Sequence, residues 1–298
     1  MSWKLTAFAS KDAVHAALVA HEAIDGWDAD IVVTGSEVAE DRPDEWVLEA
    51  YLPRTPSARD KAAVRALFGH AEPTFASARL PDTDWVAETQ ALVAPIRAGR
   101  FHVHTSDHPA DTAAIDLMIP AAQAFGTGQH ETTAGCLAML DAMRRRGVVV
   151  RNLADVGTGT GLLAFAALRL WPGATAIASD IDVVCEGVVV HNALCNAVSL
   201  GTGRGELAMV VAEGLDHAVL AGRAPYDLLI ANILAGPLIE LAGDFAAAAA
   251  PRGHLLLAGL LERQEPAVRA AYRTAGFRLA ARIVNGDWSI LWLRRRAA

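Results

Sequence analysis

From residue 152 onward, short apolar runs alternate with longer helical segments, and this alternation limits the fold more than any other feature. The runs, in chain order, are NLADVG, TAIASD, LAMVVAE, YDLLIANI and GHLLLAGL. Strands that are apolar throughout belong to parallel sheets covered by helices on both faces. Asn285-Gly286 separates two further strand-like runs and predicts a hairpin, because both residues tolerate positive φ. Five parallel strands and a hairpin predict a seven-stranded, Rossmann-like α/β sheet.

The first 80 residues follow a different order. Their pattern predicts strand, helix, strand, strand, helix and strand, which is typical of a smaller ferredoxin-like α+β domain. Prolines and a glycine punctuate the next stretch. We therefore expect an N-terminal domain over 1–80, a linker over 81–111 with one helix around Trp85 to Val93, and the sheet domain over 112–298.

Composition excludes several classes of protein. The 298 residues carry a net charge of -8, which gives no electrostatic footprint for nucleic acid. The run RRR at 294–296 is too short to change this, and it is interpreted as a charged strand end. Three cysteines without CxxC spacing indicate reduced thiols. No signal-peptide core or membrane-length apolar run is present, so we expect a cytoplasmic monomer that binds neither membrane nor nucleic acid directly.

The stretch DVGTGTG combines a glycine loop with a later carboxylate. Gly157 and Gly159, between a strand and a helix, let the backbone approach a ligand at a helix N-terminus. Asp180, at the end of the next strand, is placed to accept hydrogen bonds from ribose hydroxyls. The spacing GxGxG differs from the GxGxxG of nicotinamide and flavin binders and favours S-adenosylmethionine. The alternative is an ordinary strand-to-helix turn in which Asp180 caps the following helix.

Two further segments carry candidate site residues. Asn232 ends the fourth strand within ANILAGP, where open α/β sheets place reactive groups, and its amide oxygen can orient an amine. In AFGTGQHETT, Thr133 can offer a hydroxyl or backbone N–H to a ligand carboxylate, and Phe125 can wall the site. The structural alternatives are an Asx turn at Asn232, a helix cap at Thr133 and a core position for Phe125.

Two segments of the chain carry histidines that could take part in chemistry. FHVHTSDH places His102 and His104 two residues apart, but the segment lacks clear metal-ligand spacing and a fourth ligand. We interpret it as a solvated linker without metal. His130 is interpreted as a hydrogen-bonding loop residue rather than a general base.

The motifs AFGTGQHETTAGCL, DVGTGTGLLAFAALRL, SDID and ANILAGPL, in this order, closely resemble the bacterial ribosomal protein L-eleven (L11) methyltransferase family. Gln129 and Glu131 depart from the threonine and proline usual in its first motif. The resemblance implies a methyltransferase sheet with S-adenosylmethionine as cofactor. Carried over by position, the cofactor contacts are Thr133, Gly157, Asp180 and Asn232, and Gly159 belongs to the same loop.

The resemblance also implies a substrate. The family methylates lysine side chains and an N-terminal amine of L11, which its small first domain holds. Asn232 is the expected catalytic residue. Three alternatives remain open at this point: a methyltransferase of the same fold acting on a small molecule or nucleic acid, a nicotinamide oxidoreductase, and a cofactor-binding module without activity.

Overall fold

The computed structural model divides into two compact units, Met1–Trp85 and Val86–Ala298. Two expected features lie outside the described residues, namely the helix around Trp85 to Val93 and the loop that holds Phe125 and His130. The described residues are 3–22, 24, 27–28, 30–38, 45–69, 73–79, 94–120 and 131–296.

In its described residues, the first unit is an antiparallel sheet with two helices. Its strands lie in the order β2-β3-β1-β4. Ser57 and Asp60 form a capping box that begins α2. The core is built from residues of strands and helices, including Leu5, Leu48 and Val64. The elements are β1 (Trp3–Ser10), α1 (Lys11–Glu22), β2 (Val32–Glu37), β3 (Glu45–Leu52), α2 (Ala58–Ala66) and β4 (Thr74–Arg79).

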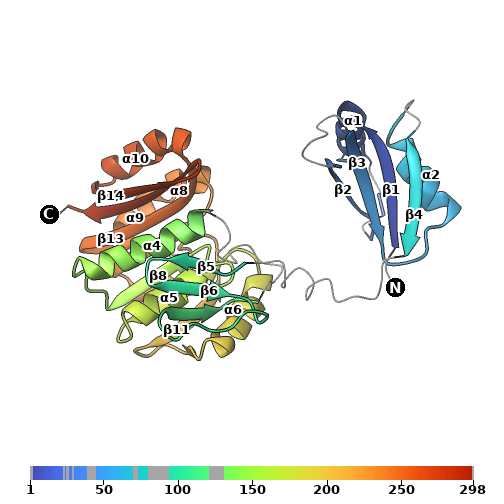
Figure 1. Ribbon diagram of the computed structural model, residues 1–298. Helices are drawn as coiled ribbons and strands as arrows, with labels where there is room; N and C mark the ends of the chain where they lie inside the picture. The colour runs from blue at the N-terminus through green and yellow to red at the C-terminus, as the bar shows by residue number, and fades with distance from the viewer. Residues whose placement is uncertain are drawn as a thin grey trace. The chain divides into compact units, whose positions relative to one another are not determined.

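The second unit, which runs from green to red in Figure 1, contains an eight-stranded sheet in the order β10-β11-β9-β8-β12-β13-β15-β14. Its five long central strands are parallel, and β15 and β14 form the antiparallel hairpin predicted from the sequence. The strand beyond the predicted seven is β10, whose two residues are too few to give an apolar pattern. The strands are β8 (Asn152–Val156), β9 (Thr175–Asp180), β10 (Ser199–Leu200), β11 (Glu206–Val211), β12 (Tyr226–Asn232), β13 (Ala249–Leu261), β14 (Phe277–Asn285) and β15 (Trp288–Arg295).

Helices cover both faces of this sheet. In β12, Leu228 and Ile230 belong to the core beneath α4, α5 and α6, whereas Leu229 and Ala231 belong to the core beneath α7 to α10. Both sets are fully buried, which explains why the centre of the strand, from Leu228 to Ala231, is apolar at consecutive positions. The helices are α4 (Glu131–Arg145), α5 (Leu162–Leu170), α6 (Val184–Cys195), α7 (Ala218–Arg223), α8 (Ala235–Glu240), α9 (Ala242–Ala248) and α10 (Glu265–Thr274), with a short 3₁₀ turn, η1 (Glu262–Gln264).

A small third sheet occupies part of the segment expected to be a linker. It contains β5 (Ile96–Ala98), β6 (Phe101–His104) and β7 (Ile115–Met118), in the order β5-β6-β7. Phe101 and Leu117 are buried in the same core as α4 and α5. The second half of 81–111 is therefore part of the second unit rather than a connection. Strands of three or four residues give too little periodicity to be predicted.

No helix among the described residues combines the length and apolar character needed to cross a membrane.

Candidate functional site

A cavity of about 1490 Å³ opens at the carboxyl ends of the parallel strands. Val156 of β8, Asp180 of β9 and Asn232 of β12 line it, together with Thr133 from the first turn of α4. Crevices at this edge of open α/β sheets are where such folds bind ligands. The structure thus brings four sequence-predicted residues, Thr133, Gly157, Asp180 and Asn232, to one cavity, along with Gly159.

The glycine loop passes over the end of β8 with unusual backbone angles. Gly157 and Gly159 have φ values of 70° and 55°, which side chains rarely adopt. A Cβ on Gly157 would lie 2.3 Å from Cγ2 of Ile233, so a larger residue would collide with the end of β12. Helix α5 begins directly after the loop and directs its free N–H groups towards this edge. The backbone conformation therefore favours glycine at both positions, and packing requires it at Gly157 as well.

Asp180 joins the loop to the end of β9. Its Oδ2 accepts a hydrogen bond from the Gly159 N–H at 2.8 Å, and its Oδ1 accepts one from the Asp182 N–H at 3.1 Å. A carboxylate has about four lone-pair sites, so each oxygen keeps capacity for a further donor. The two bonds hold the carboxylate at the cavity wall, where it can receive two hydroxyl groups of a ligand.

Thr133 and Asn232 meet although 99 positions separate them in the sequence. Asn232 Nδ2 donates to Thr133 Oγ1 at 3.3 Å. Thr133 is only 2% exposed, so the helix holds its hydroxyl in a fixed place. Because the amide nitrogen faces Thr133, the Asn232 oxygen is left as an acceptor, and it receives no hydrogen bond from any other described residue. The side chain can therefore accept an N–H from a ligand.

Asp155 lies beneath the glycine loop and was missed by sequence reasoning. Its Oδ2 accepts a hydrogen bond from Thr158 Oγ1 at 2.7 Å, which fixes the loop from below. Burial raises the pKa of this carboxyl group to about 7, because desolvation disfavours its charged form. Its position just before the glycine loop was the available signal.

Carboxylates dominate the charge of the cavity. Among the described residues that line it are six acids and no lysine, arginine or histidine. Such a cavity attracts cations and raises their local concentration. Glu213 was predictable because it follows β11 at the same edge, whereas Glu240 and Asp244 are carried by helices and gave no signal. The six acids are Asp180, Asp182, Glu213, Asp216, Glu240 and Asp244.

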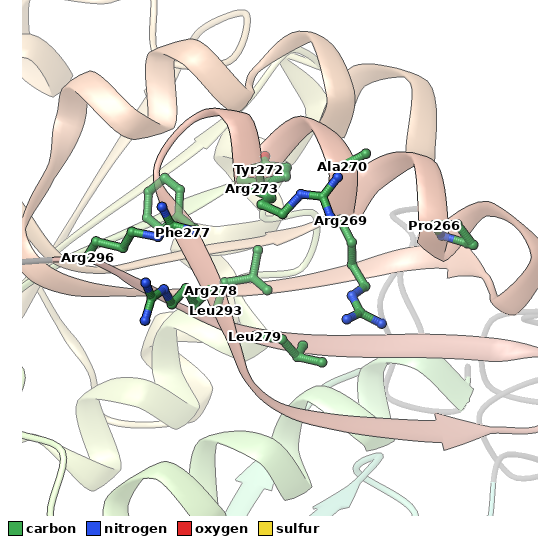
Figure 2. Close-up of a pocket in the computed structure, with 10 residues that line it drawn as sticks. All are labelled: Pro266, Arg269, Ala270, Tyr272, Arg273, Phe277, Arg278, Leu279, Leu293 and Arg296. Carbon is green, nitrogen blue, oxygen red and sulfur yellow. The ribbon is translucent and has the colours of Figure 1, made fainter.

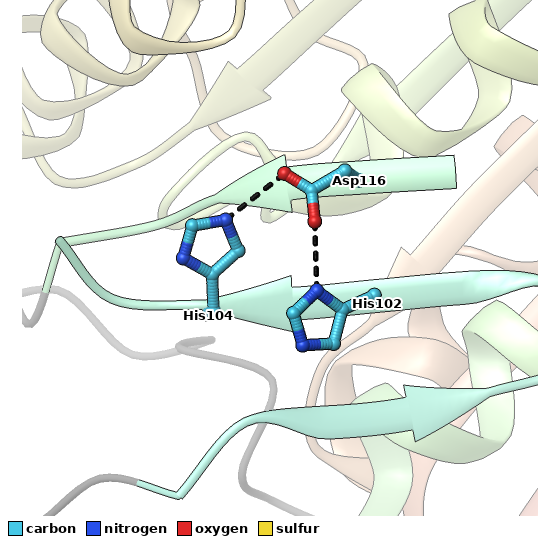
Figure 3. A group of neighbouring side chains, drawn as sticks. All are labelled: His102, His104 and Asp116. Atoms are coloured by element: carbon cyan, nitrogen blue, oxygen red, sulfur yellow. Dashed lines mark hydrogen bonds and ion pairs between the residues drawn. The ribbon is translucent and has the colours of Figure 1, made fainter. Parts of the chain in front are cut away.

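The interpretation of His102 and His104 as solvated was wrong. Both side chains are buried, at 5% and 6% exposure, and their rings stack with centroids 5.2 Å apart. Figure 3 shows Asp116 of β7 between them: Asp116 Oδ1 lies 2.7 Å from His102 Nδ1, and Oδ2 lies 2.9 Å from His104 Nε2. Each carboxylate oxygen is thus paired with one imidazole. The Asp111 backbone N–H also donates to Asp116 Oδ1, and this bond together with those from the two histidines holds the pKa of Asp116 below its usual value despite burial.

Comparison with known proteins gives a consistent result. The family model described as "Ribosomal protein L11 methyltransferase (PrmA)" matches residues 6–296. A ribosomal protein L11 methyltransferase of Agrobacterium fabrum is 37% identical over 271 residues, covering 89% of this chain and 90% of the relative. One of Rhizobium meliloti is 41% identical over 219 residues, covering 72% of each.

A solved structure is also similar. The crystal structure of a ribosomal protein L11 methylase from Lactobacillus delbrueckii subsp. bulgaricus aligns with a TM-score of 0.55 and 26% sequence identity. The alignment covers 68% of this chain and all of that one.

Proposed function

The chain belongs to the ribosomal protein L11 methyltransferase family, and from this premise we propose that it transfers methyl groups from S-adenosylmethionine to amino groups of L11. We propose lysine side chains and the N-terminal amine as the acceptors. The observation that carries the proposal is the shared cavity, in which the glycine loop, Asp180 and the Thr133–Asn232 pair converge.

The residues present fit the cofactor. Asp180 would accept hydrogen bonds from the two ribose hydroxyls, since both of its oxygens retain lone pairs. The loop at Gly157 and Gly159 would allow close approach of the amino-acid part, and the N-termini of α4 and α5 would favour its carboxylate. When bound, S-adenosylmethionine supplies an electrophilic methyl group on a positively charged sulfur. The acidic cavity favours that charge.

The substrate amine must reach the cavity, and it must be neutral when it receives the methyl group. The six carboxylates of the cavity would attract a lysine ammonium group from solution. A lysine with a pKa near 10.4 is neutral in only about one part in two thousand at pH 7, so its proton must leave to water before transfer. Asn232 Oδ1 would then accept an N–H of the neutral amine and direct the lone pair. Positioning of this kind supplies most of the acceleration for an in-line displacement.

The first unit would hold the protein substrate. Its element order and the strand order β2-β3-β1-β4 support a ferredoxin-like domain. We propose a substrate domain near 1–80, a methyltransferase domain that takes in β5 and β6 as well as the expected 112–298, a monomeric enzyme, and a cytoplasmic location. The three-stranded sheet at β5–β7 would belong to the methyltransferase domain.

The direct test is methylation of purified L11. The full chain would be incubated with L11 and S-adenosylmethionine, and the modified residues would be mapped by mass spectrometry. We expect methyl increments on lysines and on the N-terminal amine, lost in Asp180→Ala and retained in Asp107→Ala, an exposed acid outside the cavity. Unmodified L11, together with methylation of RNA or a metabolite under the same conditions, would contradict the proposal.

A further inference from the structure

Positive charge is concentrated in the last 50 residues of the chain. Residues 249–298 contain nine arginines and three acids, a net charge of +6, whereas the whole chain carries -8. The overall charge therefore hides a basic region, and charge asymmetry of this kind indicates an anionic partner. The arginines are Arg252, Arg263, Arg269, Arg273, Arg278, Arg282, Arg294, Arg295 and Arg296.

Four of these arginines lie around the same end of the β14–β15 hairpin, a region that we call the arginine face: Arg273 on α10, Arg278 on β14, Arg294 on β15, and Arg296 just beyond it. Because Leu293 belongs to the core beneath α10 and Trp292 to the core beneath α4, Arg294 lies on the α4 side of β15. All four are exposed. Their guanidinium groups make no ion pair or hydrogen bond with any described residue. Others nearby are already paired, as Arg269 is with Glu265. The arginine face thus holds four positive charges without a counter-ion in the described part of the chain.

The register of the hairpin places two of these charges directly opposite each other. Arg278 on β14 is the cross-strand partner of Arg294 on β15. Like charges in directly opposed positions destabilise an antiparallel pair. An anion bound between the two guanidinium groups would remove the repulsion.

A second cavity lies beside the arginine face. It has a volume of about 350 Å³ and lies between α10 and the β14–β15 pair. Figure 2 shows its lining side chains, with Phe277, Leu279 and Leu293 from the strands. Leu279 is 37% exposed, so part of the floor is open apolar surface. Arg269, Arg273, Arg278 and Arg296 also line it. An apolar floor bordered by guanidinium groups suits a ligand that is both flat and negatively charged.

The arginine face lies away from the cofactor cavity. In the register of β13 and β15, Trp288 pairs with Leu261 near the carboxyl edge, whereas Arg294 pairs with His254, which lies beside Leu228 near the start of β12. Strand β15 has eight residues, which at about 3.4 Å each place the two ends about 25 Å apart. A partner on the arginine face would leave the methylation site open.

We propose that the arginine face binds single-stranded RNA. The four guanidinium groups contact phosphates, and an unstacked base occupies the adjacent cavity, where arginine planes and apolar side chains provide stacking surfaces. The cavity lies within the size range of small-ligand sites, which suits one nucleotide unit. An acidic peptide would match the charge, but it would use neither the flat apolar floor nor the guanidinium planes. The net charge of the chain led to the expectation that nucleic acid is not bound. The positive charge of the arginine face is the reason to revise it.

The test is fluorescence anisotropy with a labelled single-stranded RNA of mixed sequence and the full chain. Four phosphate contacts predict a slope of log K against log salt of about -2.8, or roughly 50-fold weaker binding between about 50 and 200 mM salt. Arg273→Gln with Arg278→Gln removes two contacts. This variant is expected to bind about 25-fold more weakly at about 0.1 M salt, with a slope near -1.4.

The matched control is Arg59→Gln with Lys61→Gln, which removes the same charge from exposed positions on α2. It is expected to bind RNA like the unmodified chain. Thermal melting of both variants checks that they fold. The proposal is overturned if the chain does not bind RNA at about 50 mM salt, if both variants lose affinity equally, or if a polyglutamate peptide binds the arginine face as tightly as RNA does.

Discussion

The two ends of the large sheet carry opposite charge. At the carboxyl ends of the strands, six acids, the glycine loop and Asn232 surround a large cavity. At the other end of β14 and β15, exposed arginines border a smaller apolar cavity. The acidic cavity follows from backbone geometry, because strand ends and helix N-termini converge at this edge in any parallel sheet. The arginine face follows from the identity of its side chains, and the same fold could form without them.

This difference has a consequence for specificity. The acidic end suits cations, such as a sulfonium cofactor and a lysine, whereas the arginine face suits polyanions. Because the screening length in physiological salt is about 8 Å, sites about 25 Å apart act independently. One sheet can therefore hold two ligands of opposite charge at once.

The largest effect is expected for Asp180→Ala at the acidic end. Under the proposed function the variant would lose two charge-assisted hydrogen bonds to the ribose, so S-adenosylmethionine affinity is expected to fall about 100-fold, or about 3 kcal/mol. Isothermal titration calorimetry measures this, with Asp107→Ala as the control that keeps full affinity. An Asp180→Ala affinity within threefold of the unmodified chain would mean that the ribose does not contact this carboxylate.

A smaller effect is expected for Asn232→Ala, because the amide positions the amine. The turnover number for L11 methylation is expected to fall roughly 10- to 100-fold. Cofactor affinity should change much less than in Asp180→Ala, since the change removes one of several contacts. Steady-state kinetics and calorimetry on the same preparation separate the two. Unchanged turnover would remove Asn232 from the proposed catalytic role.

The buried acid beneath the loop predicts a dependence of stability on pH. The folded-state pKa of Asp155 is about 7, above its ordinary 3.8, so the folded protein holds this proton more tightly than the unfolded chain does. The contribution of the neutral carboxyl group to the free energy of unfolding is fully present below pH 3.8 and is lost as pH rises towards 7. Between about pH 5 and 6.5, the free energy of unfolding should fall by about 2 kcal/mol relative to Asp155→Asn. Urea denaturation at several pH values measures the difference. Parallel pH curves for the two proteins would show that Asp155 ionises normally.

The smallest effect on methylation is expected for a change at the arginine face. Arg273→Gln with Arg278→Gln is expected to change cofactor affinity and L11 methylation by less than about twofold, because screening isolates the two sites. Calorimetry and the methylation assay measure both quantities. A loss of cofactor affinity similar to that of Asp180→Ala would show that the ends of the sheet are coupled.

The sheet and much of its cavity could be predicted because their signals are local. The parallel strands are largely apolar on both faces, the loop at Gly157 follows β8, and Asp180 is the last residue of β9. Asn232 was found by the same strand-end argument. Its contact with Thr133 could not be derived from one chain segment, because the two residues meet only through the tertiary fold.

The features that were missed depend on long-range packing. Strands β5 to β7 are too short for periodicity, and the pairing of His102 and His104 with Asp116 depends on β6 lying beside β7. The acids on α8 and α9 reach the cavity only through helix placement. The arginine face was hidden because net charge averages over the whole chain.

The most direct test of the central claim is a crystal structure of the chain with S-adenosylhomocysteine. We predict that both ribose hydroxyls lie within hydrogen-bond distance of the Asp180 carboxylate and that the sulfur faces Asn232. A ligand bound away from the glycine loop, or an Asp180 side chain turned from the ribose, would contradict the account.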